Sequence, residues 1–226
     1  MSATGNSEAP AAAAAGGVPA PALDGFELAS YLGEYRGLSK VQRALYVAEH
    51  CPELGVESLR LALAELQAAT YDTTRYQAIS KQLARLTGGA ADEDGSGWVA
   101  IANSAASEQS RDIAARLERA QKQNSKRESF RAQTEHAALL QKMGRMDEAV
   151  RALQDARPFC IDIGEQAQLH VDVARVAQVM LRWLHVSSSI QRAEAVVPEL
   201  PEAVAAELAA MQAQASFCDG KWAAAA

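Results

Sequence analysis

The segment GRMDEAVRALQDA, residues 144–156, decides the fold, because its pattern of small and apolar residues returns 37 positions later. Small residues are needed where two helices of a pair touch, and the offsets are those of a tetratricopeptide helix pair. One pair cannot bury its apolar face alone, so pairs stack. The sequence therefore predicts an all-α, tetratricopeptide-like helical-repeat solenoid of antiparallel helix pairs. The two copies place these residues in register: Gly144, Ala149, Leu153 and Ala156, then Leu181, Val186, Ile190 and Ala193.

The last residues, CDGKWAAAA at 218–226, fit the start of a third copy. Gly220 and Ala225 keep the offset that separates Gly144 from Ala149. We interpret the stretch as the turn and first residues of a third helix pair whose packing partner is missing, which indicates a longer protein. For a single copy, an unrelated helical hairpin with an ordinary amphipathic stripe is the alternative, and the repetition argues against it.

Composition favours helices and narrows the class of protein. Hydrophobic residues make up 49% of the chain but aromatic residues only 5%, and alanine, a strong helix former, supplies much of the apolar content. The net charge of −6 argues against a general nucleic-acid binder, which would be basic. No apolar run approaches the roughly 18 residues that span a bilayer, and no secretory or transit signal is visible. We expect no nucleic-acid or membrane partner and a location in the cytoplasm and nucleus.

The chain divides into four segments by composition. Residues 1–23 are rich in Ala, Pro and Gly and have too little to bury, so we expect a disordered tail. Residues 24–86 should form an N-terminal helical segment. Residues 87–97, TGGAADEDGSG, should be a flexible acidic linker. Residues 98–226 should hold one long helix followed by the repeats.

Side chains that accept hydrogen bonds from the first helical amides predict where helices begin. Asp24, Ser39 and Asp72 are expected to cap three helices of the N-terminal segment. Ser125 and Glu128 have the spacing of a capping box, in which each side chain satisfies an amide at the helix start. The long helix should begin at Trp98, end near Gln123 and turn these residues inward: Ile101, Ile113 and Leu117.

The sequence predicts no catalytic, cofactor or metal site. The histidines do not form H-E-x-x-H or H-x-H, and the cysteines form no C-x-x-C pair, so we expect reduced thiols and no metal cluster. GSGWVA, residues 95–100, fits G-x-G-x-x-A, but the carboxylates of the preceding ADEDG would repel a pyrophosphate. We expect a helix start there, and an enzyme is the least favoured class. The residues concerned are His50, His136, His170, His185, Cys51, Cys160 and Cys218.

A cluster of cations surrounds the junction between the long helix and the helix after it. Only Glu118 and Glu128 lie near it in the sequence. The simplest interpretation is a solvated helix face, and the alternative is a docking patch for an acidic partner surface. No aromatic residue interleaves with the cations, which disfavours a stacking platform for single-stranded nucleic acid. This basic cluster comprises Arg116, Arg119, Lys122, Lys126, Arg127 and Arg131.

Several motifs, in order, resemble a known family. YLGEYRGLSKVQRALYVAEHCPELGVESLRLAL, residues 31–63, is similar to the N-terminal region of subunit one of the COP-9 signalosome: it holds the family's Y-x-G-L turn, an I-A-D-H-C-P-like stretch and a V-E-A-L-like helix start. Residues 122–131 and 144–160 match two later family segments, the second less closely. The likeness is collinear from about residue 26 to residue 226. Residues 134–145 depart from it, because they keep the family's glycine and lose most of its polar residues.

The resemblance implies a non-catalytic scaffold subunit. In this family, shared with a related proteasome-lid subunit, helical repeats lead into a winged-helix PCI domain, which is absent from this sequence. Signalosome membership implies other signalosome subunits as partners, and cullin-RING ligase components as further ones, in a complex that removes a ubiquitin-like modifier from cullins. A different subunit of that complex carries the zinc metalloprotease, and its H-x-H plus S-x-x-D signature is absent here.

Two alternatives stay open. The first is the proteasome-lid counterpart, although the AEHCP match at residues 48–52 favours the signalosome. The second is a free-standing adaptor that binds short peptides in its groove. Such a solenoid would need a polar capping helix at its C-terminus, and KWAAAA at 221–226 is not polar.

Overall fold

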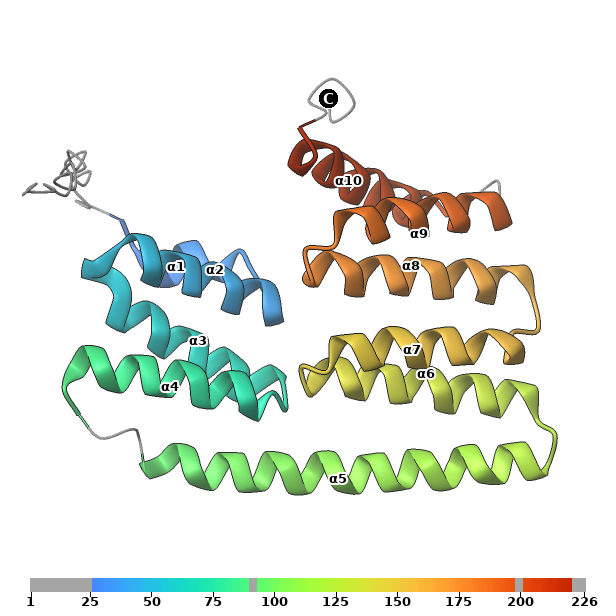
Figure 1. The fold of residues 1–226 in the computed structure, drawn as a ribbon, viewed down its shortest axis with the longest axis horizontal. Helices are drawn as coiled ribbons and strands as arrows, with labels where there is room; N and C mark the ends of the chain where they lie inside the picture. Colours follow the sequence, from blue (N-terminus) through green and yellow to red (C-terminus); the bar gives the residue numbers. More distant parts are fainter. Residues whose placement is uncertain (1–25, 90–92, 198–200, 221–226) are drawn as a thin grey trace, which may run out of the picture.

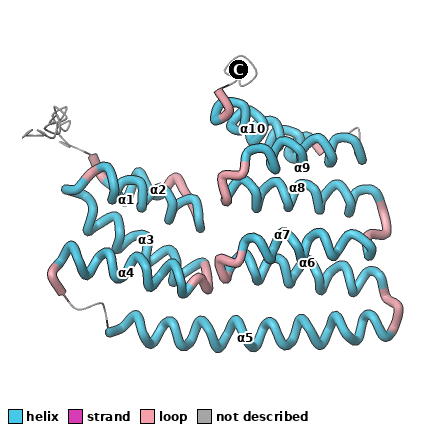
Figure 2. The backbone as a smooth tube through the Cα atoms, in the orientation of Figure 1, coloured by secondary structure: helices cyan, strands magenta, loops and turns pink. Residues whose placement is uncertain are grey.

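The computed structural model describes residues 26–89, 93–197 and 201–220, and within them every regular element is a helix (Figure 1). The all-α prediction is therefore confirmed, as the colouring by secondary structure also makes plain (Figure 2). The predicted tail, the Asp24 cap and Ala225 lie outside the described residues. The α-helices are α1 Leu28–Gly33, α2 Gly37–His50, α3 Gly55–Ala69, α4 Thr73–Thr87, α5 Glu93–Lys122, α6 Lys126–Lys142, α7 Met146–Ala156, α8 Ile163–Val179, α9 Trp183–Val196 and α10 Glu202–Cys218, with short 3-10 turns at Pro52–Leu54 and Arg157–Phe159.

The helices form two groups that share one long element. Helices α1–α4 form the first group and α6–α10 the second, and α5 runs beneath both (Figure 1). Its 30 residues span about 45 Å at the usual helical rise. It packs closely along α6 and more lightly against α4. A single helix of this length therefore fixes the spacing of the two groups.

The repeat turns owe their shape to one backbone conformation. Gly144 ends α6 with a φ of +74°, and Leu181 ends α8 with a φ of +57°. After each, an amide reaches back to the fifth residue before it: the Arg145 N–H donates to the Leu140 carbonyl, and the Arg182 N–H to the Ala177 carbonyl, both at 2.9 Å. This is the bond that closes a Schellman motif. The positions that the repeat aligned thus share a geometry as well as a spacing.

Leu181 occupies a conformation that suits glycine better. A non-glycine residue with a left-handed backbone costs about 1 kcal/mol, and the side chain is exposed, so little packing offsets that cost. We expect Leu181→Gly to raise the free energy of unfolding by about 0.5 kcal/mol, because the relief exceeds the added chain entropy of glycine. Urea denaturation followed by circular dichroism measures the change. Leu184→Gly, in the first turn of α9 and also exposed, is the control and should instead lose up to about 1 kcal/mol.

The two helical groups also meet directly, away from α5. The Tyr71 N–H, in the turn between α3 and α4, donates to the Lys142 carbonyl at the end of α6 at 2.7 Å. Higher in the stack, Gln42 Nε2 on α2 donates to the Val179 carbonyl at the end of α8 at 3.0 Å. Leu38 packs against the core of α6, α7 and α8. The C-terminal ends of two repeat helices therefore receive donors from the N-terminal group, which satisfies carbonyls that a helix end leaves unpaired.

Gly144 lies at the closest approach of the two groups. Asp72 is only 4% exposed and caps α4 by accepting a hydrogen bond from the Arg75 N–H at 2.9 Å. A Cβ atom added to Gly144 would lie 2.5 Å from the Asp72 Cγ and 2.9 Å from its Oδ1. The glycine thus serves twice, since it supplies the left-handed turn and leaves room for a buried carboxylate.

The predicted linker is too long. Helix α5 begins at Glu93, inside the expected linker of residues 87–97, and five positions before Trp98. The reason is tertiary: the Tyr76 and Trp98 rings pack with centroids 4.6 Å apart, and a Cβ at Gly95 would lie 2.9 Å from the Tyr76 ring. Contact with α4 therefore holds a glycine-containing stretch in helix, although its composition favours a loop.

Three local predictions about helices are also corrected. Asp72 caps α4 as expected, but α2 begins at Gly37, so Ser39 lies within it and caps nothing. Ser125 takes the N-cap position of α6 without a side-chain hydrogen bond, so no capping box forms. Ile101 is 69% exposed, because Ala102 and Ala106 form the buried face of this part of α5 in its place, whereas Ile113 is buried as expected.

A bidentate ion pair ties α10 to α8. Both oxygens of Glu207 accept hydrogen bonds from the Arg175 guanidinium at 2.7 Å, and Arg175 also contacts Asp172. The hydrogen bond from Arg175, and then its charge, lower the pKa of Glu207. Because both side chains are more than a third exposed, solvent screens the pair and it contributes about 0.5–1 kcal/mol.

The ion pair predicts a pH-dependent effect of Glu207→Gln. A carboxyl whose pKa is lowered by folding stabilises the protein above its unfolded pKa of about 4.3, and that contribution disappears as the pH falls through the folded pKa. We expect Glu207→Gln to lower the free energy of unfolding by about 0.5–1 kcal/mol at neutral pH and to match the unchanged protein in acid. Urea denaturation at several pH values measures this. A loss that is equal at every pH would contradict the assignment.

Candidate interaction surfaces

The repeat-packing positions lie at the contacts between paired helices. Those of α7 and α9 are fully buried, and Gly144, Leu181 and Gly220 all have positive φ values in turns that follow α6, α8 and α10. The first core joins α6, α7 and α8, and the second joins α8, α9 and α10. Helix α8 therefore contributes to both cores, which is how a stacked solenoid grows. The buried members are Ala149, Leu153, Ala156, Val186, Ile190 and Ala193.

Half of the basic cluster is neutralised locally. Arg116 pairs with Glu135 and Asp112, while Lys122 pairs with Glu118 and Arg131 with Glu128. The remaining cations have no carboxylate partner within the described parts of the chain. These are Arg119 near the end of α5 and Lys126 and Arg127 at the start of α6, all exposed. Sequence spacing could not indicate Glu135, which folding brings from the neighbouring helix α6, whereas Asp112 lies four residues before Arg116 on α5 and was overlooked.

No cluster that could hold a metal ion occurs among the described residues. The cysteines in those ranges are free, and burial, followed by the charge of Glu165, raises the pKa of the Cys160 thiol, so that the inert thiol form is favoured. The phosphate-loop lookalike, residues 95–100, lies within α5, where it forms helix instead of a loop. Nor is any described helix long and apolar enough to cross a bilayer.

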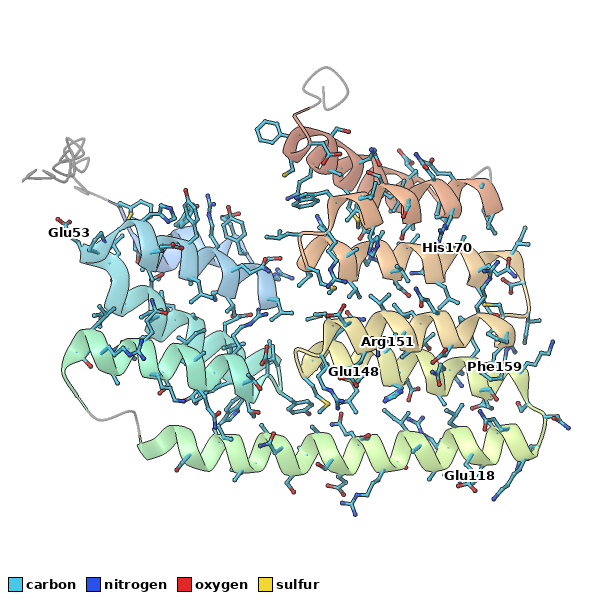
Figure 3. The ribbon with its side chains drawn as sticks, viewed as in Figure 1. Glu53, Glu118, Glu148, Arg151, Phe159 and His170 are labelled. Atoms are coloured by element: carbon cyan, nitrogen blue, oxygen red, sulfur yellow. The ribbon has the colours of Figure 1, made fainter. Side chains whose placement is uncertain are left out.

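A groove of about 290 Å³ between α7, α8 and α9 was not predicted from the sequence. Its lining residues come from three helices that are separated along the chain, so no local motif marks it. Figure 3 labels one of them, His170, on α8, which runs between α7 and α9. We call it the α7–α9 groove; its polar lining is Gln154, Arg157, Gln166, His170, Ser189 and Arg192.

Comparison with known protein families identifies the family to which this helical architecture belongs. The family model described as 26S proteasome subunit RPN7 matches residues 96–226, which cover α5 and the repeats. The chain belongs to the RPN7 family. The match covers more than half of the chain and begins close to the start of the long helix. The resemblance inferred from the motifs is therefore confirmed at the level of the family.

Curated relatives of this RPN7 family member carry a signalosome name. The chain is 28% identical to COP9 signalosome complex subunit 1 of Schizosaccharomyces pombe over 197 residues, which are 87% of this chain and 46% of that protein. It is 38% identical to COP9 signalosome complex subunit 1b of Drosophila melanogaster over 69 residues, which are 30% of this chain and 12% of that protein. The chain thus spans less than half the length of either relative.

Proposed function

We propose that this RPN7 family protein is a non-catalytic scaffold subunit of the COP-9 signalosome. The observation that carries the proposal is the collinear similarity to a subunit 1 protein over 87% of the chain. In this role the protein would support removal of a ubiquitin-like modifier from cullins by another subunit, in the cytoplasm and nucleus. Its partners would be the other signalosome subunits and, through them, components of cullin-RING ligases.

The architecture suits a scaffold. Helix α5 holds two helical groups at a fixed separation, and hydrogen bonds between the groups limit their relative motion. Both groups expose helix faces and turns on which partner helices can pack. A rigid surface loses little conformational entropy when a partner binds, so the preformed arrangement favours assembly.

A proteasome-lid role is the second candidate function. The specific observation in its favour is the family description itself, 26S proteasome subunit RPN7. The two candidates predict different partners for the same solenoid. Affinity purification of the tagged chain from cells, followed by mass spectrometry, tests them. We expect signalosome subunits, and recovery of proteasome lid and base subunits in their place would favour the second candidate.

The free cations of the basic cluster are proposed to attract an acidic partner surface. Arg119, Lys126 and Arg127 flank the junction of α5 and α6 with no carboxylate partner in the described structure, so their field is not cancelled locally. We expect the variant with all three changed to Glu to join its complex about tenfold more slowly at low salt, because long-range steering is lost. Surface plasmon resonance at two salt concentrations measures the association rate. The same changes at the paired Arg116, Lys122 and Arg131 serve as the comparison and should slow association less.

A further inference from the structure

The α7–α9 groove concentrates positive charge without a matching negative charge. Arg157 and Arg192 line it from opposite sides, one after α7 and the other on α9. Neither forms an ion pair with any described residue, and no Asp or Glu is among the residues that line the groove. The two arginines thus differ from Arg145, Arg175 and Arg182 of the same repeats, each of which pairs with an acidic side chain.

The acidic residues nearest in sequence to these arginines, Asp155 and Glu194, are exposed and do not line the groove, and those of the turn before α8 are already engaged. In the turn before α8, the Glu165 carboxylate accepts a hydrogen bond from the Ile161 N–H at 2.7 Å, and Asp162 accepts one from the Glu165 N–H at 2.8 Å. Both carboxylates therefore hold the start of α8. They do not line the groove, so they leave the arginines there uncompensated.

His170 reports the positive field inside the groove. It is half-buried on α8, and its pKa is lowered first by burial and then by the charges of Arg157 and Arg192. The imidazole is therefore neutral at physiological pH and can donate one hydrogen bond while the two guanidiniums carry the charge. The apolar floor of Leu153, Leu169 and Val173 lowers the local dielectric, which strengthens any charge pairing made there.

Ser189 adds a hydroxyl that has no hydrogen-bond partner among the described residues. Ser189 is only 4% exposed as a whole, and it lines the groove from α9. The Ser189 Oγ is not among the fully buried polar atoms that lack a partner, so the hydroxyl is open to the groove and free to donate to a ligand there. It stands as an observation independent of the arginines, and it is directed at the same space.

We propose that the α7–α9 groove is a binding site for the carboxylate side chains of an acidic segment of a partner protein. Arg157 and Arg192 would form charge-assisted hydrogen bonds to one or two carboxylates, with Ser189 and His170 donating to their remaining oxygens. The groove volume of about 290 Å³ admits a few side chains and excludes a folded domain. The proposal goes beyond the scaffold role and does not depend on which complex the chain joins.

The test is fluorescence anisotropy with a labelled peptide of alternating Glu and Gly and the full chain. We expect the peptide to bind, and its Gln counterpart to bind at least tenfold more weakly. Arg157→Glu and Arg192→Glu should each weaken binding by about tenfold, and Ser189→Ala by about fivefold. Arg151→Glu is the matched control, since Arg151 lies exposed on α7 outside the groove (Figure 3), and it should leave binding unchanged.

Nuclear magnetic resonance of the histidine ring protons provides a readout that loss of folding cannot imitate. A bound carboxylate should raise the pKa of His170 while the signals of the other histidines stay in place. Equal binding of the Glu and Gln peptides, or wild-type affinity in both groove variants, would overturn the proposal. So would binding of inorganic phosphate or single-stranded RNA in the groove without binding of the acidic peptide.

Discussion

Gly144→Ala is expected to lower the free energy of unfolding by about 2–4 kcal/mol, one of the two largest effects of a single substitution considered for this protein. Two costs add. The φ of +74° disfavours any residue with a Cβ by about 1–2 kcal/mol, and the new methyl group would overlap the buried Asp72 carboxylate. If Asp72 moves to avoid the overlap, α4 loses its N-terminal cap. Urea denaturation followed by circular dichroism measures the loss.

Two comparisons separate these costs. Gly37 also has a positive φ, +56°, but a Cβ there meets nothing within 4 Å, so Gly37→Ala should cost only about 1 kcal/mol. The double variant Gly144→Ala with Asp72→Ala removes the overlap, and its total cost should be smaller than the sum of the single costs by about 1 kcal/mol. Additive costs would mean that the two turns do not touch in solution.

Leu153→Ala is expected to cost about 2–4 kcal/mol, because it opens a cavity in the core shared by α6, α7 and α8. Leu153 is 2% exposed and packs among Ala137, Leu140 and Leu169. These neighbours are held by their helices, so they cannot fully fill the cavity that the missing leucine side chain leaves. Leu184→Ala, at a site 78% exposed on α9, is the control and should change stability by less than about 0.5 kcal/mol. Chemical denaturation of the two variants side by side gives the comparison, and similar losses would argue against the repeat core.

The sequence predicted the repeat well because its signal is local. Small and apolar residues recur at a fixed spacing, and the structure buries those on α7 and α9 between paired helices. The left-handed conformation of Leu181 was not predicted, since leucine rarely adopts it and only the alignment with Gly144 marks the position. The start of α5 was misplaced for the opposite reason: Tyr76 and Trp98 override a composition that favours a loop.

The interaction surfaces were less accessible to sequence reasoning. The basic cluster was found because its members are close in the chain, but its pairing with Glu135 depends on how α5 and α6 face each other. The α7–α9 groove was missed because Arg157 and Arg192 are far apart in the sequence and belong to no motif. Stacking of the repeats brings these two arginines to one groove, and only the three-dimensional structure can indicate this.

Native mass spectrometry of reconstituted assemblies tests the central claim most directly. The chain is mixed with equal amounts of signalosome subunits and proteasome-lid subunits, and the masses of the resulting complexes identify its partners. Membership in the signalosome predicts that the chain's mass appears in complexes with signalosome subunits. Its appearance only with lid subunits, or only as the free chain, would contradict the account.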